Sequence, residues 1–92
     1  SWPIDDIAEE LAAQWQGPDV TSADIRKMVL LVCRETRDIP LMQPDQSTFI
    51  NLQNKIVTKF GLDRVTGSWN AWNLVTTAHA RCQGASVTTS FS

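Results

Sequence analysis

The sequence predicts an all-α fold, a compact single-domain bundle of four to five short helices. Apolar residues recur at three- and four-residue spacings in several separate stretches, which is typical of amphipathic helices. Isolated glycines and prolines stand between these stretches, where helices should end. With 92 residues, 42% of them hydrophobic and 20% charged, the chain is long enough for one core and too apolar for wholesale disorder.

Residues 24–37 form the segment around which we expect the rest of the chain to fold. The run Met28–Cys33 holds six apolar residues, and periodicity alone cannot separate a buried strand from a helix in so short a stretch. Thr21 followed three residues later by Asp24 has the form of a capping box, and Arg34 suits the negative end of a helix dipole. We therefore expect a helix buried over most of its circumference, with the other helices packed about it.

A first helix is expected from about residue 3 to residue 16. Its apolar residues recur on one face, and acidic residues occupy most of the remaining surface. Gly17 and Pro18 should end it, because glycine accepts a left-handed cap and proline cannot continue a helix. The residues of the apolar face are Ile4, Ile7, Leu11 and Trp15.

Two further helices are expected after a connector, residues 38–46, that contains two prolines. Ser47 is the expected cap of the third helix, which should run through Lys59 and end at Gly61. The last helix should follow a cap at Ser68.

The last helix should reach about Gln83 and end before Gly84. The helical domain then spans residues 1–84, and residues 85–92 form a flexible Ser/Thr-rich tail. Trp69 and Trp72 are placed on the inward side of the last helix. The residues that we expect to be buried are Val29, Val32, Phe49, Ile56, Trp72 and Val75.

Few residues are suited to catalysis or metal binding. Cys33 and Cys82 fall in expected helix interiors, so we expect buried free thiols in a reducing compartment. Together with His79 they provide at most three ligands, short of a structural zinc set, so no metal and no cofactor is expected. The sequence offers no nucleophile with a positioned base and no glycine-rich loop that could cradle a phosphate, so we expect no enzymatic activity.

Charge is distributed unevenly along the chain. Residues 1–25 carry six acids and no base, whereas residues 26–92 carry eight bases and four acids. A positive face could meet anionic lipid or nucleic acid, or the two halves could neutralise each other within one fold. Nucleic-acid binding is disfavoured, because the turn Gly61–Gly67 is too long for a helix-turn-helix and the helix after it begins with Trp69 rather than polar or basic residues.

The order of these features resembles the matrix domain at the front of retroviral Gag polyproteins, particularly the compact helical kind of alpharetroviruses and deltaretroviruses. The resemblance spans nearly the whole chain as a pattern of helices and loops. One departure is the acidic character of residues 1–25, where the family often places bases. The matching stretches are Ile4–Trp15, Thr21–Leu31, Ile39–Asp45 and Ser68–Val75.

The resemblance implies a non-enzymatic structural module that targets a polyprotein to the anionic inner surface of the plasma membrane during virus assembly, cytoplasmic and peripheral, and then carried in the virion. The partner is an anionic phospholipid surface, and protein partners are expected as well. The alternative is a helical adaptor domain that binds protein and touches neither lipid nor nucleic acid. A contiguous basic patch would favour the first function and an exposed apolar patch the second. The membrane-binding candidates are Arg26, Lys27, Arg34, Lys55, Lys59 and Arg64.

Overall fold

The computed structural model describes the backbone of residues 2–43 and 45–91 and the side chains of residues 2–43 and 45–84. Within these ranges the chain forms four helices and no strand, so the predicted all-α fold is confirmed. The helices are α1 (Ile4–Gln14), α2 (Ser22–Glu35), α3 (Gln46–Lys59) and α4 (Thr66–Phe91).

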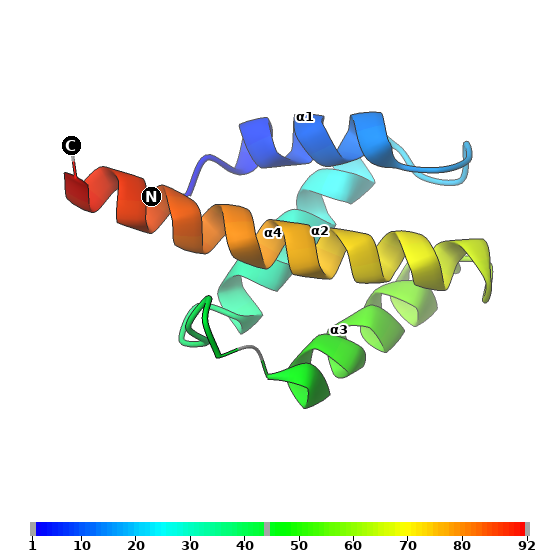
Figure 1. Ribbon diagram of the computed structural model, residues 1–92. Coiled ribbons are helices and arrows are strands. Elements are labelled where there is room, and N and C mark those ends of the chain that lie inside the picture. Colours follow the sequence, from blue (N-terminus) through cyan, green and yellow to red (C-terminus); the bar gives the residue numbers. More distant parts are fainter. Residues whose placement is uncertain (1, 44, 92) are drawn as a thin grey trace.

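Helix α4 is the element that joins the others. It crosses the front of the molecule, with α1 above it, α3 below it and α2 behind it (Figure 1). It contacts all three, whereas α3 packs mainly on α4 and α1 packs mainly on α2. The expectation that the other helices pack about α2 is therefore wrong for α3, and α4 holds the central place.

The beginning of α2 follows the expected capping box. Asp24 donates its backbone N–H to Thr21 Oγ1 at 3.1 Å, and Thr21 donates its backbone N–H to Asp24 Oδ2 at 3.2 Å. Two backbone donors that a helix start leaves without partners are thereby satisfied.

Helix α3 begins earlier than expected because an aspartate caps it. Asp45 Oδ1 accepts the backbone N–H of Thr48 at 3.3 Å, and α3 starts at Gln46. The predicted cap at Ser47 is wrong, since this residue already lies in the first turn. A carboxylate also suits the positive end of the helix dipole.

Helix α4 also starts from an aspartate rather than from the predicted cap at Ser68. Asp63 Oδ2 accepts the backbone N–H of Thr66 at 2.8 Å. Gly67 then lies in the first turn, where a Cβ atom would stand 2.5 Å from Leu62 Cβ. Only glycine fits at this close approach between the helix and the turn that precedes it.

The other end of α4 lies beyond the predicted one. The helix continues through Gly84 to Phe91. A single glycine inside a helix costs about 1 kcal/mol relative to alanine, which does not by itself stop a helix. The flexible tail predicted for residues 85–92 concerns residues whose side chains lie outside the described part of the chain, and it stays a prediction.

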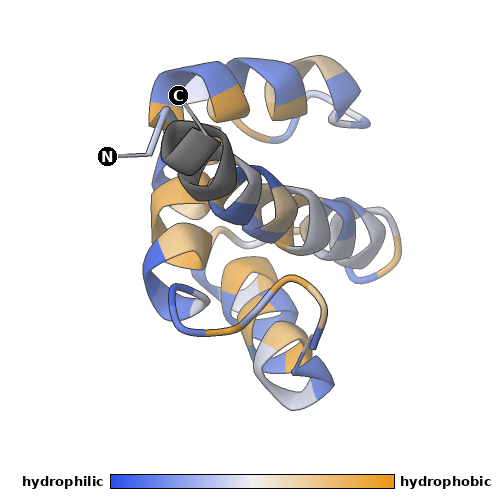
Figure 2. Ribbon diagram, turned by 60° about the vertical axis from the view of Figure 1, so that its left-hand side comes forward, coloured by the Kyte–Doolittle hydropathy of each residue, from blue (hydrophilic) through white to orange (hydrophobic). Residues whose placement is uncertain are grey.

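The ribbon is mostly hydrophobic where the helices face one another and mostly hydrophilic along the outer side of α1 (Figure 2). Of the six residues predicted to be buried, five are buried and Trp72 is only partly so. Trp69, expected on the inward side of α4, is 56% exposed. The inner line of α4 consists instead of smaller residues, namely Ala71, Leu74, Val75, Ala78 and Cys82.

A disulfide joins Cys33 of α2 to Cys82 of α4, so the expectation of free thiols is wrong. The two residues are 49 apart in sequence, but the packing of α2 on α4 brings their Cα atoms to 6.1 Å. This separation lies within the range that a disulfide spans. Such bonds persist mainly in oxidising compartments. The disulfide-bonded form therefore does not fit the reducing compartment expected from the sequence.

We expect Val32→Asp to unfold the domain at physiological temperature. Val32 is fully buried, and an unpaired buried charge costs several kcal/mol against a total stability of about 5 to 15 kcal/mol. Met42→Asp is the matched control, because Met42 is 88% exposed and should melt like the wild type. Thermal melts followed by circular dichroism compare the two variants. A cooperative wild-type-like melt of Val32→Asp would contradict the core described here.

We expect a reductant to lower the melting temperature. The chain-entropy model gives about 4 kcal/mol for a crosslink between residues 49 apart, and the measured loss is often smaller. Melting with and without a thiol reductant tests this, with loss of the bond checked by mass spectrometry. The variant Cys33→Ala/Cys82→Ala is the control, since its melting temperature should not respond to the reductant. An unchanged wild-type melt after verified reduction would show that the bond contributes nothing.

Candidate functional site

The outward side of α2 carries a row of basic residues. Helical spacing turns Ile25, Val29 and Val32 to the core and leaves the opposite side of the helix exposed. A partly buried leucine, Leu30, lies at the middle of this opposite side. We call its four exposed cations the basic face: Arg26, Lys27, Arg34 and Arg37.

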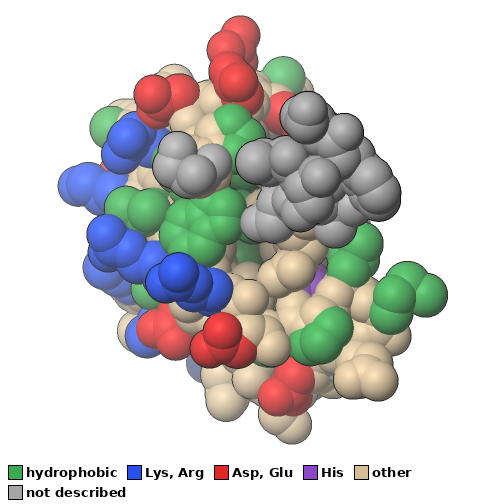
Figure 3. Space-filling model, turned by 90° about the vertical axis from the view of Figure 1, so that its left-hand side faces the viewer, with side chains coloured by type: hydrophobic (Ala, Val, Ile, Leu, Met, Phe, Trp, Pro, Cys, Tyr) green, Lys and Arg blue, Asp and Glu red, His purple; other side chains and the backbone are tan. Residues whose placement is uncertain are grey.

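Arg37 extends the basic face beyond the end of α2 and meets an aromatic ring. Gln83 of α4 donates its side-chain N–H to the carbonyl oxygen of Arg37 at 3.2 Å, which holds this turn against α4. The guanidinium carbon of Arg37 lies 5.9 Å from the centre of the Trp2 ring, within the reach of a cation–π interaction. Lys and Arg side chains gather on this side of the molecule beside a hydrophobic surface (Figure 3).

Not every cation of the basic face is available to an external partner. Arg26 Nε donates to Asp5 Oδ1 at 2.6 Å, which links α2 to the acidic helix α1. In the described part of the chain, Lys27, Arg34 and Arg37 form no ion pair. Three cations therefore remain uncompensated by direct contact.

The other three predicted candidates lie elsewhere. Lys55 and Lys59 are exposed on α3, and Lys55 Nζ lies 3.6 Å from Glu35 Oε1. Arg64 stands in the turn before α4. The structure thus places Arg26, Lys27 and Arg34 on one side of α2 and the other three candidates on other elements.

Sequence reasoning missed Arg37 as a member of this surface. The spacing of the sequence did indicate it. Arg37 lies eleven residues after Arg26, close to three helical turns, and three residues after Arg34. Trp2 had no such signal, since its approach to Arg37 depends on how α1 packs on the rest of the fold.

Acidic residues of α1 form the neighbouring surface and are partly neutralised by α4. Arg81 donates from Nε and Nη2 to the two carboxylate oxygens of Glu10, at 2.9 and 2.6 Å. This hydrogen bonding lowers the pKa of Glu10 and raises that of Arg81. The expected neutralisation between the two halves of the chain therefore occurs in part, through Asp5 with Arg26 and Glu10 with Arg81.

The single histidine has a structural role. His79 is buried, with Nε2 at 2.7 Å from the carbonyl oxygen of Ile39 and its ring edge-on to Phe49 at 5.1 Å. It fastens the loop after α2 to α4. Among the described residues no group of three or more His, Cys, Asp or Glu side chains could hold a metal ion.

No described helix is long and apolar enough to cross a bilayer. Comparison with known proteins gives no match from protein-family models, curated proteins or solved structures. The fold and the surface together define a four-helix domain with a basic face on one helix.

The Glu10–Arg81 pair predicts a pH dependence of stability. The pKa of Glu10 is lowered on folding, so its contribution is present above the ordinary value of 4.5 and is lost as the pH falls below it. The difference in melting temperature between wild type and Glu10→Gln should therefore be largest near neutral pH and shrink below 4.5. Arg81→Gln removes the pair from the other side and should reproduce the pattern. A difference that stays constant with pH would contradict it.

Proposed function

We propose that this domain is a non-enzymatic module that binds the anionic inner surface of a membrane through the basic face of α2, as retroviral Gag matrix domains do. The observation that carries the proposal is the grouping of Lys27, Arg34 and Arg37, none paired with an acid in the described part of the chain, on one exposed side. Long-range attraction to anionic lipid contributes about 1 kcal/mol per base. Binding through three such bases is weak and reversible.

Trp2 adds a second reason to place the membrane at this surface. Its ring lies beside Arg37 and is only partly buried. Tryptophan is enriched at the level of lipid headgroups, where its apolar body and its polar N–H are both accommodated. A basic residue stacked on such a ring suits a surface that meets headgroups and the edge of the acyl region.

The second candidate function is a protein-interaction domain. It is favoured by the exposed side chains of Val65 and Trp69, which lie on α4 and the turn before it rather than on α2. The two functions use different surfaces, so both can belong to one chain.

Sedimentation with liposomes that contain anionic lipid tests the membrane proposal. Arg34→Glu should reduce binding, because it reverses an unpaired charge of the basic face. Arg64→Glu makes the same change of net charge in the turn before α4 and should reduce binding much less. Equal losses would show that only net charge matters and that the basic face is not the contact.

Further conditions separate lipid binding from other outcomes. Binding should fade with salt, because the screening length falls from about 10 Å at 0.1 M to about 3 Å at 1 M. Glu9→Gln/Glu10→Gln should leave binding unchanged or strengthen it, and Lys55→Glu/Lys59→Glu should weaken it less than reversal of Arg34.

Oxidised and reduced protein are both assayed, since the cytoplasm keeps thiols reduced. No sedimentation at low salt in either form, or binding to RNA alone, would contradict the proposal.

A further inference from the structure

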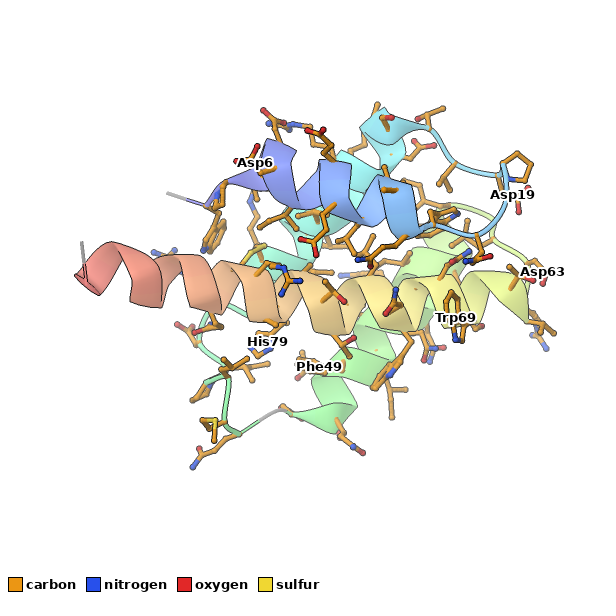
Figure 4. All side chains as sticks on the ribbon, turned by 45° about the horizontal axis from the view of Figure 1, so that its top comes forward. Asp6, Asp19, Phe49, Asp63, Trp69 and His79 are labelled. Carbon is orange, nitrogen blue, oxygen red and sulfur yellow. A yellow bond between two sulfur atoms is a disulfide. The ribbon has the colours of Figure 1, made fainter. Side chains whose placement is uncertain are left out.

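A group of apolar side chains remains exposed where α3 packs on α4. Val65 is 79% exposed, Trp69 56% and Ile50 45%, and Trp72 and Val57 are partly buried beside them. We call these five residues the tryptophan face. Trp69 and Asp63 lie toward one end of α4, while His79 and Phe49 lie farther along it (Figure 4).

Two contacts hold the α3 and α4 parts of this face together. Gln53 of α3 donates its side-chain N–H to the carbonyl oxygen of Ser68 of α4 at 2.8 Å. Ile50 and Val57 stand three residues before and four after Gln53, and hence on its side of α3. Trp69 and Trp72 stand one and four residues after Ser68.

The second contact lies beneath the tryptophans. Phe49 packs edge-on against Trp72, with ring centres 6.3 Å apart. Trp69 donates its backbone N–H to the carbonyl oxygen of Val65 at 3.2 Å, so these two belong to one row on the same helix turn. Four of the five residues of the face therefore lie on two packed helices, and Val65, in the turn before α4, is held by a backbone hydrogen bond from that helix.

Charge distinguishes this face from the other two described surfaces. The outward residues between and beside its apolar members are neutral, namely Asn54, Thr58, Asn73 and Thr76. Charges appear only at its end, where Asp63 and Arg64 are adjacent and opposite in sign. A second copy of the same face can therefore approach it without placing like charges against each other, whereas an anionic membrane or a charged peptide gains little there.

We propose that the tryptophan face binds the same face of a second copy of this chain, in a two-fold dimer. Its exposed apolar surface is on the order of 400 Å². A standard interface takes about 800 Å² from each partner, a little more than half of it apolar, so the face supplies the apolar share of a small interface. Tryptophan is also one of the three residue types enriched among those that dominate binding energy. The dimer does not depend on lipid binding, since it uses another surface.

Analytical ultracentrifugation of the whole chain, from micromolar to millimolar concentration, tests this contact. The weight-average mass should rise towards twice that of the monomer, and the rise should survive high salt because the contact is apolar. Trp69→Ser should weaken self-association about 30-fold or more, as expected for a central tryptophan. Val65→Ser should weaken it less, since valine contributes less contact area.

Met42→Ser is the matched control, because Met42 is 88% exposed but lies in the loop between α2 and α3. It should dimerise like the wild type. Circular dichroism confirms that each variant is folded, and a non-reducing gel excludes dimers linked by disulfides. A chain that stays monomeric at millimolar concentration would overturn the proposal, and so would growth beyond two copies. A dimer that dissociates at high salt, or one that Trp69→Ser leaves as stable as the wild type, would overturn it as well.

Discussion

Small side chains along the inner line of α4 let the other three helices pack closely against it. Gly67 lies against Leu62 so closely that no Cβ fits, and Ala71 and Ala78 are fully buried farther along. Larger residues at these positions would push the neighbouring helices away and open the core, which native packing density does not tolerate. Because the inner line is occupied by small groups, Trp69 is left on the outward flank. The exposed tryptophan face is thus a consequence of how closely α4 is packed.

Much of this fold could be predicted from the sequence because its signals are local. The capping box of Thr21 and Asp24 depends on residues three apart and locates the start of α2, and apolar periodicity locates α1. The starts of α3 and α4 were missed because two caps competed within a few residues, and the aspartates Asp45 and Asp63 prevailed. The sequence also cannot say which of several apolar residues on a helix side reaches the core, so Trp69 was misplaced.

The candidate site was less predictable, since it depends on contacts between distant segments. A list of six bases follows from composition, but which of them share a surface depends on helix orientation. Arg26, Lys27 and Arg34 share the outward side of α2, whereas Lys55 and Lys59 lie on α3 and Arg64 in the turn before α4. The pairing of Arg26 with Asp5 joins residues 21 apart and removes one of these charges from outward action. The disulfide is the clearest case. Two cysteines 49 residues apart carry no sequence signal of pairing, which appears only when α2 and α4 pack side by side.

The bond between Cys33 and Cys82 also turns the chain into a closed ring from which two arms extend. Residues 34–81, with all of α3 and most of α4, lie inside this ring. A force applied at the two ends of the chain therefore cannot extend these residues, because the load crosses from α2 to α4 through the bond over a Cα separation of 6.1 Å. Only α1, most of α2 and the last part of α4 can be drawn out, at no more than about 3.6 Å per residue. Tension along the chain can therefore draw out Arg26 and Lys27 of the basic face, whereas Arg34, Arg37 and all five residues of the tryptophan face lie within the ring.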